Sequence, residues 1–274
     1  MLVATLLALG SAVLHAGWNY AVKQSAGDRF LALWGQFFFA GVLSAVVVVV
    51  MGMPATGWIW AGLSGAIHVP YAWFLARAYS GGDFSMVYPV ARGGGAALAA
   101  IGGIALLGDD LQPLSITAIA TIVVGLVVLA GRASSAALLQ AIVVAFCIGG
   151  YSVSDAHGIR STGAFSYAFA TFVCGGALIT LSGVVAGRGP AMTQALRDNS
   201  RRYTLAAVAV VITYTMVQYA FRRAPVGYVT SLRESSVVIA AVVGWRYLGE
   251  SAGKRRVTAT LIVLSGLILL VVSR

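Results

Sequence analysis

The chain has 274 residues, of which 59% are hydrophobic and only 9% are charged, whereas a soluble domain averages about a quarter charged residues. Most of its surface must therefore face lipid, which excludes an ordinary soluble domain. The net charge of +10 does not indicate binding to nucleic acid, because the basic residues are scattered and stand mainly at the ends of apolar runs.

Ten predominantly apolar runs follow one another along the chain, and each is about 20 residues long, the length that crosses a bilayer as a helix. Gly, Pro, Asp or clustered Arg separates them. The runs lack the period-two alternation of membrane strands, and only the segment between 187 and 202 is longer than a turn. We therefore expect an all-α membrane protein. Its ten helices are predicted at 2–22, 29–51, 57–79, 84–107, 113–131, 135–155, 164–186, 203–222, 225–248 and 256–273.

The second half of the chain repeats the first at an offset of 141 residues. Residues 88–132 align with residues 229–273 without a gap, with eleven identities in 45 positions. Arg92 falls on Arg233, and "LLGDD" falls on "YLGES". An odd number of helices in each copy inverts the second copy relative to the first, as in transporters built from inverted repeats. We predict one transmembrane domain made of two five-helix repeats, residues 1–132 and 133–274.

Basic residues are distributed unequally between the two sides of this predicted bundle. The side richer in Lys and Arg is expected in the cytoplasm, which places both termini outside. The loops after the odd-numbered helices hold Lys23, Arg29, Arg77, Arg132, Arg188, Arg197, Arg201, Arg202, Arg246, Lys254, Arg255 and Arg256, and the other side holds Arg160, Arg222, Arg223 and Arg274.

The ten runs, the duplication and an apolar helix ending in Leu-Gly-acidic in each half resemble the EamA family of the drug/metabolite transporter superfamily. The Leu-Gly-acidic segments are "ALLGDDL" (105–111) and "RYLGESA" (246–252). The resemblance covers essentially the whole chain and implies a transporter. It does not imply one substrate, because relatives move amino acids, sugars, nucleotide sugars and cations.

Three further segments resemble a bacterial subgroup of that family, some of whose members sit beside phosphonate-utilisation genes. They are "LHAGWN" (14–19), "YPVARG" (88–93) and "LRESSVVIAAVVGWRYLGE" (232–250). The resemblance implies a bacterial cytoplasmic membrane. One departure is Asp109-Asp110, where the first repeat more usually carries Gly-Glu, although Asp can serve as the same cap.

Arg92 lies deep in its predicted helix, about 13 Å from the start at 1.5 Å per residue. A charge near the membrane centre costs roughly 2.5–3.5 kcal/mol on insertion scales, so Arg92 and its repeat partner Arg233 should face protein or a water-filled cavity. One interpretation is that they bind a carboxylate or phosphonate through the guanidinium fork. The alternative is that Asp155 and Glu234 neutralise them and lock helices together.

Hydrogen-bonding side chains recur at helical spacing on the first, third, fourth, sixth, eighth and ninth predicted helices. These stripes predict a central polar cavity, with ordinary buried packing as the alternative for each residue. The other four helices are plainer and are expected to face lipid or act as scaffold, and the glycines after Arg92 are expected to let another helix approach closely. The candidate substrate-binding residues are His15, Trp18, Asn19, His68, Tyr71, Tyr88, Arg92, Tyr151, Tyr214, Gln218 and Arg233.

We expect a monomeric secondary transporter that holds a small amino-acid-like, carboxylate- or phosphonate-bearing solute in this cavity and exposes it alternately to the two sides. Protons are a candidate coupling ion, through Asp155, Glu234 or the histidines. A lipid flippase that recognises a phosphate head group is the alternative, and a passive channel is a further interpretation. An enzyme is not expected, because nucleophile motifs and metal-ligand spacing are missing. We expect no cofactor, metal or nucleic acid.

Overall fold

The computed structural model describes residues 1–23, 27–81, 84–130, 135–239 and 254–273. Within these ranges it describes all side chains except those of residues 16–23, 79–81, 84–89, 130, 135–137, 254 and 256. The described residues contain no strand, which confirms the prediction of an all-α protein. Their helices are α1 (Leu2–Lys23), α2 (Arg29–Met51), α3 (Ala55–Gly81), α4 (Phe84–Leu107), α5 (Pro113–Ala130), α6 (Ser135–Thr162), α7 (Tyr167–Val185), α8 (Gly189–Phe221), α9 (Val226–Arg233) and α11 (Lys254–Val272).

The length and the apolar character of the helices agree with a membrane protein. In the described part of the chain, five helices are long and apolar enough to cross a membrane, and three more apolar helices are shorter. The five are found at Arg29–Met51, Val90–Leu107, Leu138–Thr162, Tyr167–Val185 and Gly189–Phe221, and the shorter ones at Leu2–His15, Pro113–Leu129 and Val257–Val272.

Three helix boundaries differ clearly from the sequence-based expectation. The sixth helix was expected to end at residue 155, but α6 continues to Thr162. The expectation of a loop over residues 187–202 is wrong, because α8 already begins at Gly189. Met192 and Ala195 are buried on one side of this first part of α8. The segment is therefore an amphipathic helix, which its polar composition did not indicate. The single helix expected over 225–248 is also interrupted: α9 ends at Arg233, Glu234 is a turn, and the chain is helical again over 235–239.

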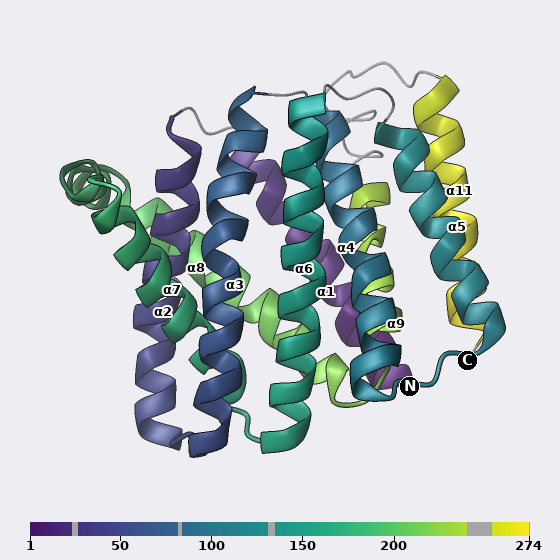
Figure 1. Ribbon diagram of the computed structural model, residues 1–274, viewed down its shortest axis with the longest axis horizontal. Coiled ribbons are helices and arrows are strands. Elements are labelled where there is room, and N and C mark those ends of the chain that lie inside the picture. Colours follow the sequence, from purple (N-terminus) through teal and green to yellow (C-terminus); the bar gives the residue numbers. More distant parts are fainter. Residues whose placement is uncertain (24–26, 82–83, 131–134, 240–253, 274) are drawn as a thin grey trace.

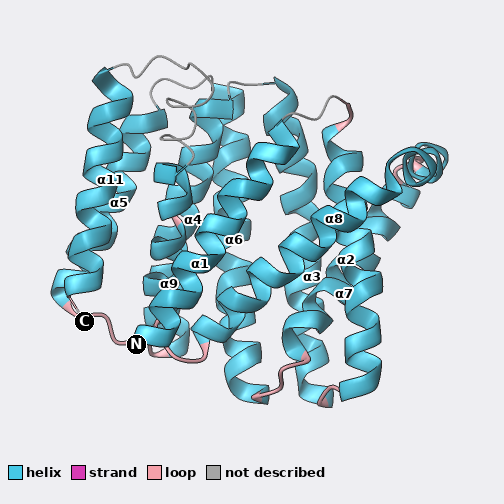
Figure 2. Cartoon of the chain, turned by 180° about the vertical axis from the view of Figure 1, so that it is seen from behind, coloured by secondary structure: helices cyan, strands magenta, loops and turns pink. Residues whose placement is uncertain are grey.

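The helices form a row with a second layer behind it. In Figure 1, α2, α3, α6, α4 and α5 stand side by side, with α7 packed on α2 and α3 at one end and α11 packed on α5 at the other. Figure 2, seen from behind, shows α1 and α8 running obliquely across this row. Helix α1 contacts both α8 and α9, and α9 contacts α4. The space between the two layers is therefore bounded by helices from both halves of the chain.

Glycines allow the closest helix contacts. A Cβ atom on Gly94, Gly95 or Gly102 would lie 2.5–2.9 Å from side chains of α6, which confirms the expected packing role of the glycines after Arg92. Where α2 crosses α7, a Cβ on Gly176 would lie 2.6 Å from the backbone carbonyl oxygen of Phe37. Close packing on α6 fixes α4, the helix that carries Arg92.

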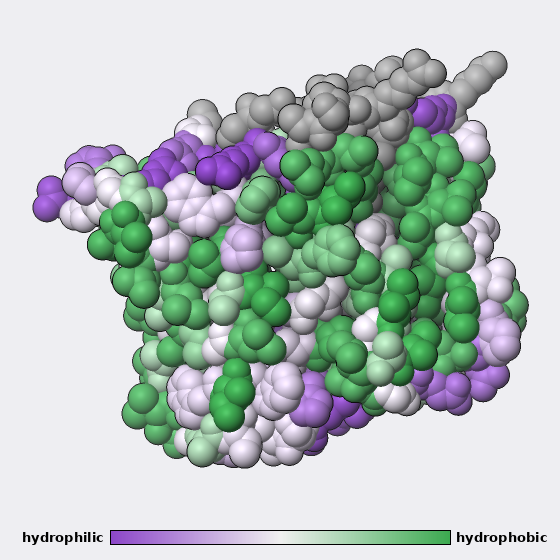
Figure 3. Space-filling model, viewed as in Figure 1, coloured by the Kyte–Doolittle hydropathy of each residue, from purple (hydrophilic) through white to green (hydrophobic). Residues whose placement is uncertain are grey.

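The surface is divided as a bilayer requires. Apolar residues cover most of the middle of the face in Figure 3, and hydrophilic residues gather along its upper and lower edges. The start of α1 and the end of α11 lie at the lower edge, together with the loops at 108–112 and 222–225 (Figure 1). Helix α2 begins at the upper edge with Asp28 as its N-cap, whose side chain accepts hydrogen bonds from the N–H groups of Phe30 and Leu31.

Candidate functional site

A cavity of about 460 Å³ lies between the two helix layers. Its walls come from α1, α2, α3, α4, α6, α7, α8 and α9. At its inner end it reaches His15, Arg92 and Arg233. At its outer end it reaches the exposed residues Asp28 and Arg202. Asp28 is the N-cap of α2, which begins near the upper edge of Figure 1. The cavity therefore connects a buried pair of arginines with one edge of the molecule, and its volume suits a small organic solute.

The two arginines differ in their partners. Arg92 and Glu234 form a buried ion pair, with 2.7 Å between Arg92 Nη2 and Glu234 Oε1. Arg92 Nε also donates to Glu234 Oε2 at 3.4 Å. The side chains of Arg92 and Glu234 are 8% and 2% exposed, so this pair is almost fully removed from water. Of the two carboxylates proposed to neutralise the arginines, Glu234 is the one that contacts Arg92.

Arg233 is as deeply buried as Arg92, at 6% exposure. Within the described ranges it forms no ion pair, and its Nε atom has no hydrogen-bond partner. Its guanidinium carbon lies 5.8 Å from the ring centroid of Tyr214, a cation–π contact that offsets part of the desolvation of the charge. A buried charge without a counter-ion is costly, and here it stands in the wall of a cavity.

The interruption of the helix coincides with these charges. The Glu234 N–H donates to the Ser231 carbonyl, and the Val237 N–H donates to the Glu234 carbonyl. Both are i→i+3 bonds of the tighter 3₁₀ type, which often marks a functional hinge inside a helix. In the described chain, Ser231, Ser235 and Ser236 each have a buried hydroxyl without a hydrogen-bond partner beside this turn. Such a concentration of unpartnered polar atoms is unusual in a packed interior.

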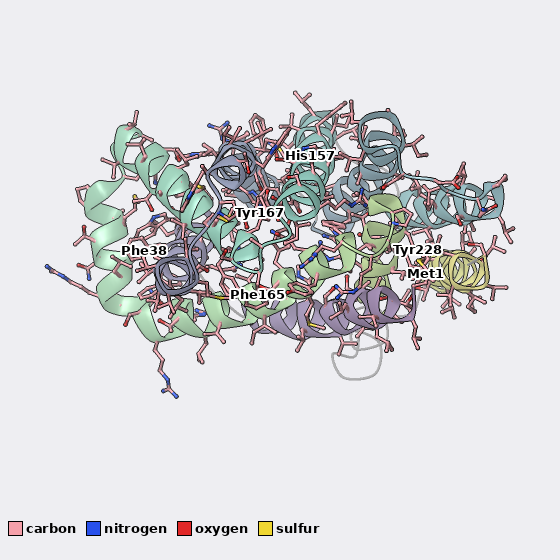
Figure 4. All side chains as sticks on the ribbon, turned by 90° about the horizontal axis from the view of Figure 1, so that it is seen from below. Met1, Phe38, His157, Phe165, Tyr167 and Tyr228 are labelled. Atoms are coloured by element: carbon pink, nitrogen blue, oxygen red, sulfur yellow. The ribbon has the colours of Figure 1, made fainter. Side chains whose placement is uncertain are left out.

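Asp155 is engaged elsewhere. It is fully buried on α6, and its carboxylate accepts hydrogen bonds from the hydroxyls of Tyr214 and Tyr167. In the part of the chain that is described it forms no ion pair with either arginine. Figure 4, seen from the lower edge, shows Tyr167 among the helices of the interior. Asp155 therefore orients Tyr214, whose ring in turn faces Arg233.

Aromatic rings form the wall beside the arginines. His68 stacks on Tyr151 with 4.3 Å between ring centroids, and Tyr71 meets Tyr151 edge-on at 5.9 Å. Tyr151 lies 6.1 Å from Tyr214. His68 Nδ1 is within hydrogen-bond distance of the Ser64 carbonyl, at 2.8 Å. These contacts hold the rings in place and leave apolar faces beside the charged end of the cavity.

Most of the sequence-predicted residues line this one cavity. His15, His68, Tyr71, Arg92, Tyr151, Tyr214 and Arg233 are all in its wall. Gln218 stands behind the wall and donates to the hydroxyl of Thr171, which lines the cavity. The side chains of Trp18, Asn19 and Tyr88 lie outside the described residues.

Two helices expected to be scaffold also line the cavity, so that expectation is wrong. Helix α2 contributes Gln36 and Phe37, and α7 contributes Thr171 and Phe172. The sequence signal was weak in each case, because the few polar residues of these helices are widely spaced, as Gln36 and Ser44 are on α2 and Thr171 and Thr180 are on α7. The outer end was missed as well, because Asp198 and the residues around it were assigned to a loop.

Charged residues surround the outer end of the cavity. Asp28, Arg29, Asp198 and Arg202 all lie there. Asp28 pairs with Arg188, whose guanidinium also lies 4.9 Å from the Phe30 ring centroid. Partial burial raises the pKa of the Asp28 carboxyl, but hydrogen bonds from Arg188 and from the backbone outweigh this effect and hold the pKa below its usual range. This carboxylate therefore stays ionised at neutral pH.

The opposite edge is tied together by Asp109. Gly108 turns the chain after α4 with a φ of +67°, a conformation that suits glycine. Asp109 then pairs with Arg160 at 2.7 Å and accepts the backbone N–H of Val226, the first residue of α9, at 2.6 Å. Arg160 donates in addition to the carbonyls of Phe221 and Ala224. One cluster thus joins the ends of α4, α6 and α8 to the start of α9, and none of its residues lines the cavity.

Comparison with known proteins agrees with this architecture. A solved crystal structure of a protein superposes with a TM-score of 0.76 at 17% sequence identity, covering 98% of this chain and 97% of its own. That likeness shows the fold. No curated protein matches the chain at a significant level. The profile of the EamA-like transporter family matches residues 135–272, about half of the chain. The protein therefore belongs to the EamA family of the drug/metabolite transporter superfamily and is a multi-pass membrane transporter.

Proposed function

We propose that this transporter carries a small organic anion or zwitterion, of the amino-acid, carboxylate or phosphonate kind, and that Arg233 binds its anionic group. The supporting observation is the buried Arg233 guanidinium in the cavity wall, which forms no ion pair among the described residues. An arginine fork suits a carboxylate or phosphonate in two parallel hydrogen bonds. Binding such a group supplies a counter-ion that none of the described residues provides.

The rings beside Arg233 complete this proposed site. The faces of Tyr71, Tyr151 and Phe172 can pack against the carbon skeleton of the solute, and they can also receive an ammonium group through cation–π attraction. His15 and Gln36 offer hydrogen-bonding groups in the same wall. The combination favours a solute with one anionic group and an organic body over an inorganic ion.

We further propose that residues 1–132 and 133–274 are inverted repeats that expose the cavity alternately. Reciprocal packing supports this reading. A Cβ on Gly125 would meet Val263, and a Cβ on Gly266 would meet Ile122, and adding or subtracting 141 converts one pair into the other. Likewise α3 packs on α6 as α8 packs on α1, and α3 packs on α7 as α8 packs on α2. This two-fold relation is what an inverted duplication produces.

The state described here has its cavity directed toward one edge. Asp28 and Arg202 mark that edge, and the Asp109 cluster ties the helices at the other. In our proposal the basic edge faces the cytoplasm of a bacterial inner membrane, so the described state is inward-facing. The protein acts as a monomer, and outward opening requires the Asp109–Arg160 contact to separate. Protons remain the proposed coupling ion.

Asp109→Asn is expected to weaken the lower edge. Arg160 loses its carboxylate partner, and a charged hydrogen bond is worth about 1.5–3 kcal/mol. The midpoint of thermal unfolding in detergent should fall. A membrane-impermeant thiol reagent should also label a cysteine placed at Ala224, which is buried in the described state, faster from the lower side. Native Cys147 and Cys174 are first replaced by alanine. Asp110→Asn, at the exposed neighbouring position, is the matched control. Equal labelling of both variants would contradict a gating role for Asp109.

Ligand-induced stabilisation tests the proposed substrate class. A ligand that binds only the folded state increases the free energy of unfolding by mass action, by about 2.7 kcal/mol at one hundred times its Kd. The unfolding midpoint rises as a result. The purified protein is heated with amino acids, phosphonates, sugar phosphates, polyamines, neutral sugars and a short-chain phospholipid in turn. Stabilisation by carboxylates or phosphonates supports the proposal. Stabilisation by polyamines or neutral sugars alone refutes it, and stabilisation by short-chain phospholipid alone favours the flippase.

A further inference from the structure

Among the described residues, the buried charges around the cavity are not balanced between the two halves of the chain. Two arginines, Arg92 and Arg233, stand in the cavity wall, while one carboxylate, Glu234, is paired with Arg92. The other nearby carboxylate, Asp155, accepts hydrogen bonds from two tyrosines and does not line the cavity. The wall therefore presents two guanidinium groups to a ligand, one of which is already neutralised from behind.

This imbalance has a single sequence origin. At the offset of 141 residues Arg92 corresponds to Arg233, but the following residue is Gly93 in the first copy and Glu234 in the second. Gly93 packs against Leu126 and offers no charge, whereas Glu234 reaches across to the arginine of the other half. Glu234 thus cancels one of two otherwise equivalent positive charges.

We propose that Glu234 determines how many negative charges the ligand carries, so that the wild-type site accepts one anionic group and rejects two. Arg233 supplies a positive charge that no described residue pairs with. A second carboxylate on the ligand would find Arg92 already paired with Glu234 and would lie close to the Glu234 carboxylate. Like charges brought together in a desolvated site repel by several kcal/mol, so rejection of a dianion is built in. Specificity of this kind uses repulsion as much as attraction.

The inference rests on the proposed function, because it assumes that Arg233 binds an anion. It adds a role that Arg233 alone does not supply. If Glu234 were merely structural, it would hold Arg92 in place but would not affect which ligand charge the site prefers. Removing its charge would then change the Kd values of monoanions and dianions by the same factor. The two possibilities differ in one measurable quantity, the ratio of the Kd values for a monoanion and a dianion of the same length.

Butyrate and succinate are the probes, since they share a four-carbon chain and carry one and two carboxylates near neutral pH. Binding to the purified protein is measured by thermal shift or calorimetry. We expect Glu234→Gln to change the Kd ratio in favour of succinate by at least about tenfold, and the double variant Arg92→Gln/Glu234→Gln to return it to the wild-type value. Asp198→Asn removes one negative charge at the outer end of the cavity and should leave the ratio unchanged.

A second comparison covers the case in which Glu234→Gln alone does not fold. On the Arg92→Gln background, removing the Glu234 charge should improve butyrate binding by about tenfold or more, because the net charge of the three residues rises from zero to one. An unchanged ratio in a folded Glu234→Gln protein, or no gain in the second comparison, overturns the inference while the proposed function stands. Wild-type protein that binds neither probe nor any other anion overturns both.

Discussion

Glu234→Gln is expected to destabilise the ligand-free protein by about 3 kcal/mol, because breaking a buried ion pair leaves its partner charge without compensation. Arg92 is 7% exposed and has Glu234 as its carboxylate partner. A glutamine oxygen can still accept one hydrogen bond from Arg92, but it supplies no charge. The measurement is the thermal unfolding midpoint in detergent, followed by tryptophan fluorescence, and it should fall by several degrees.

A double-mutant cycle separates the ion pair from other effects at this position. Arg92→Gln should destabilise the protein by a similar amount, because it strands Glu234 instead. The double variant Arg92→Gln/Glu234→Gln should be more stable than either single variant, since it buries no unpaired charge. If the effects of the two single variants simply add in the double variant, Arg92 and Glu234 are not coupled in the folded protein. The ion pair would then contribute nothing to the free energy of unfolding.

The helix order was predictable because lipid selects for length and apolarity, which are properties of single segments. The failures lie where structure depends on something other than apolarity. The start of α8 is polar along one face and packs through Met192 and Ala195 on the other, so a count of apolar residues reads it as a loop. The interruption at Glu234 rests on two i→i+3 backbone bonds, which no hydropathy pattern encodes.

The candidate site was predictable in its membership and less so in its pairing. Charged and polar residues in apolar helices must face protein or water, and this requirement alone brings together Arg92, Tyr151 and Arg233. Which carboxylate meets which arginine depends on distances across helices. Asp155 is held by tyrosine hydroxyls from α7 and α8, leaving Glu234 as the partner of Arg92. The contribution of α2 was missed because Gln36 and Ser44 are the only polar side chains in a long apolar run and are eight residues apart.

Arg233→Gln is expected to abolish stabilisation by anions while leaving the ligand-free protein at least as stable as the wild type. In the described part of the chain Arg233 forms no ion pair, so its burial costs free energy that glutamine does not require. Loss of a buried charge that pairs with a ligand costs about 2–5 kcal/mol of binding, which is roughly 30-fold or more in Kd. The opposite signs of these two effects distinguish a ligand-binding arginine from a structural one.

Arg202→Gln is the matched control, because Arg202 also lines the cavity but is exposed at its outer end. Solvent screens a charge there, so its removal should change anion binding by about 1 kcal/mol or less. Both variants are compared with the wild type for unfolding midpoint without ligand and for the shift on adding the stabilising anion. If Arg233→Gln lowers the ligand-free midpoint as far as Glu234→Gln does, Arg233 has a structural partner. The proposed anion site would then have to be sought elsewhere in the cavity.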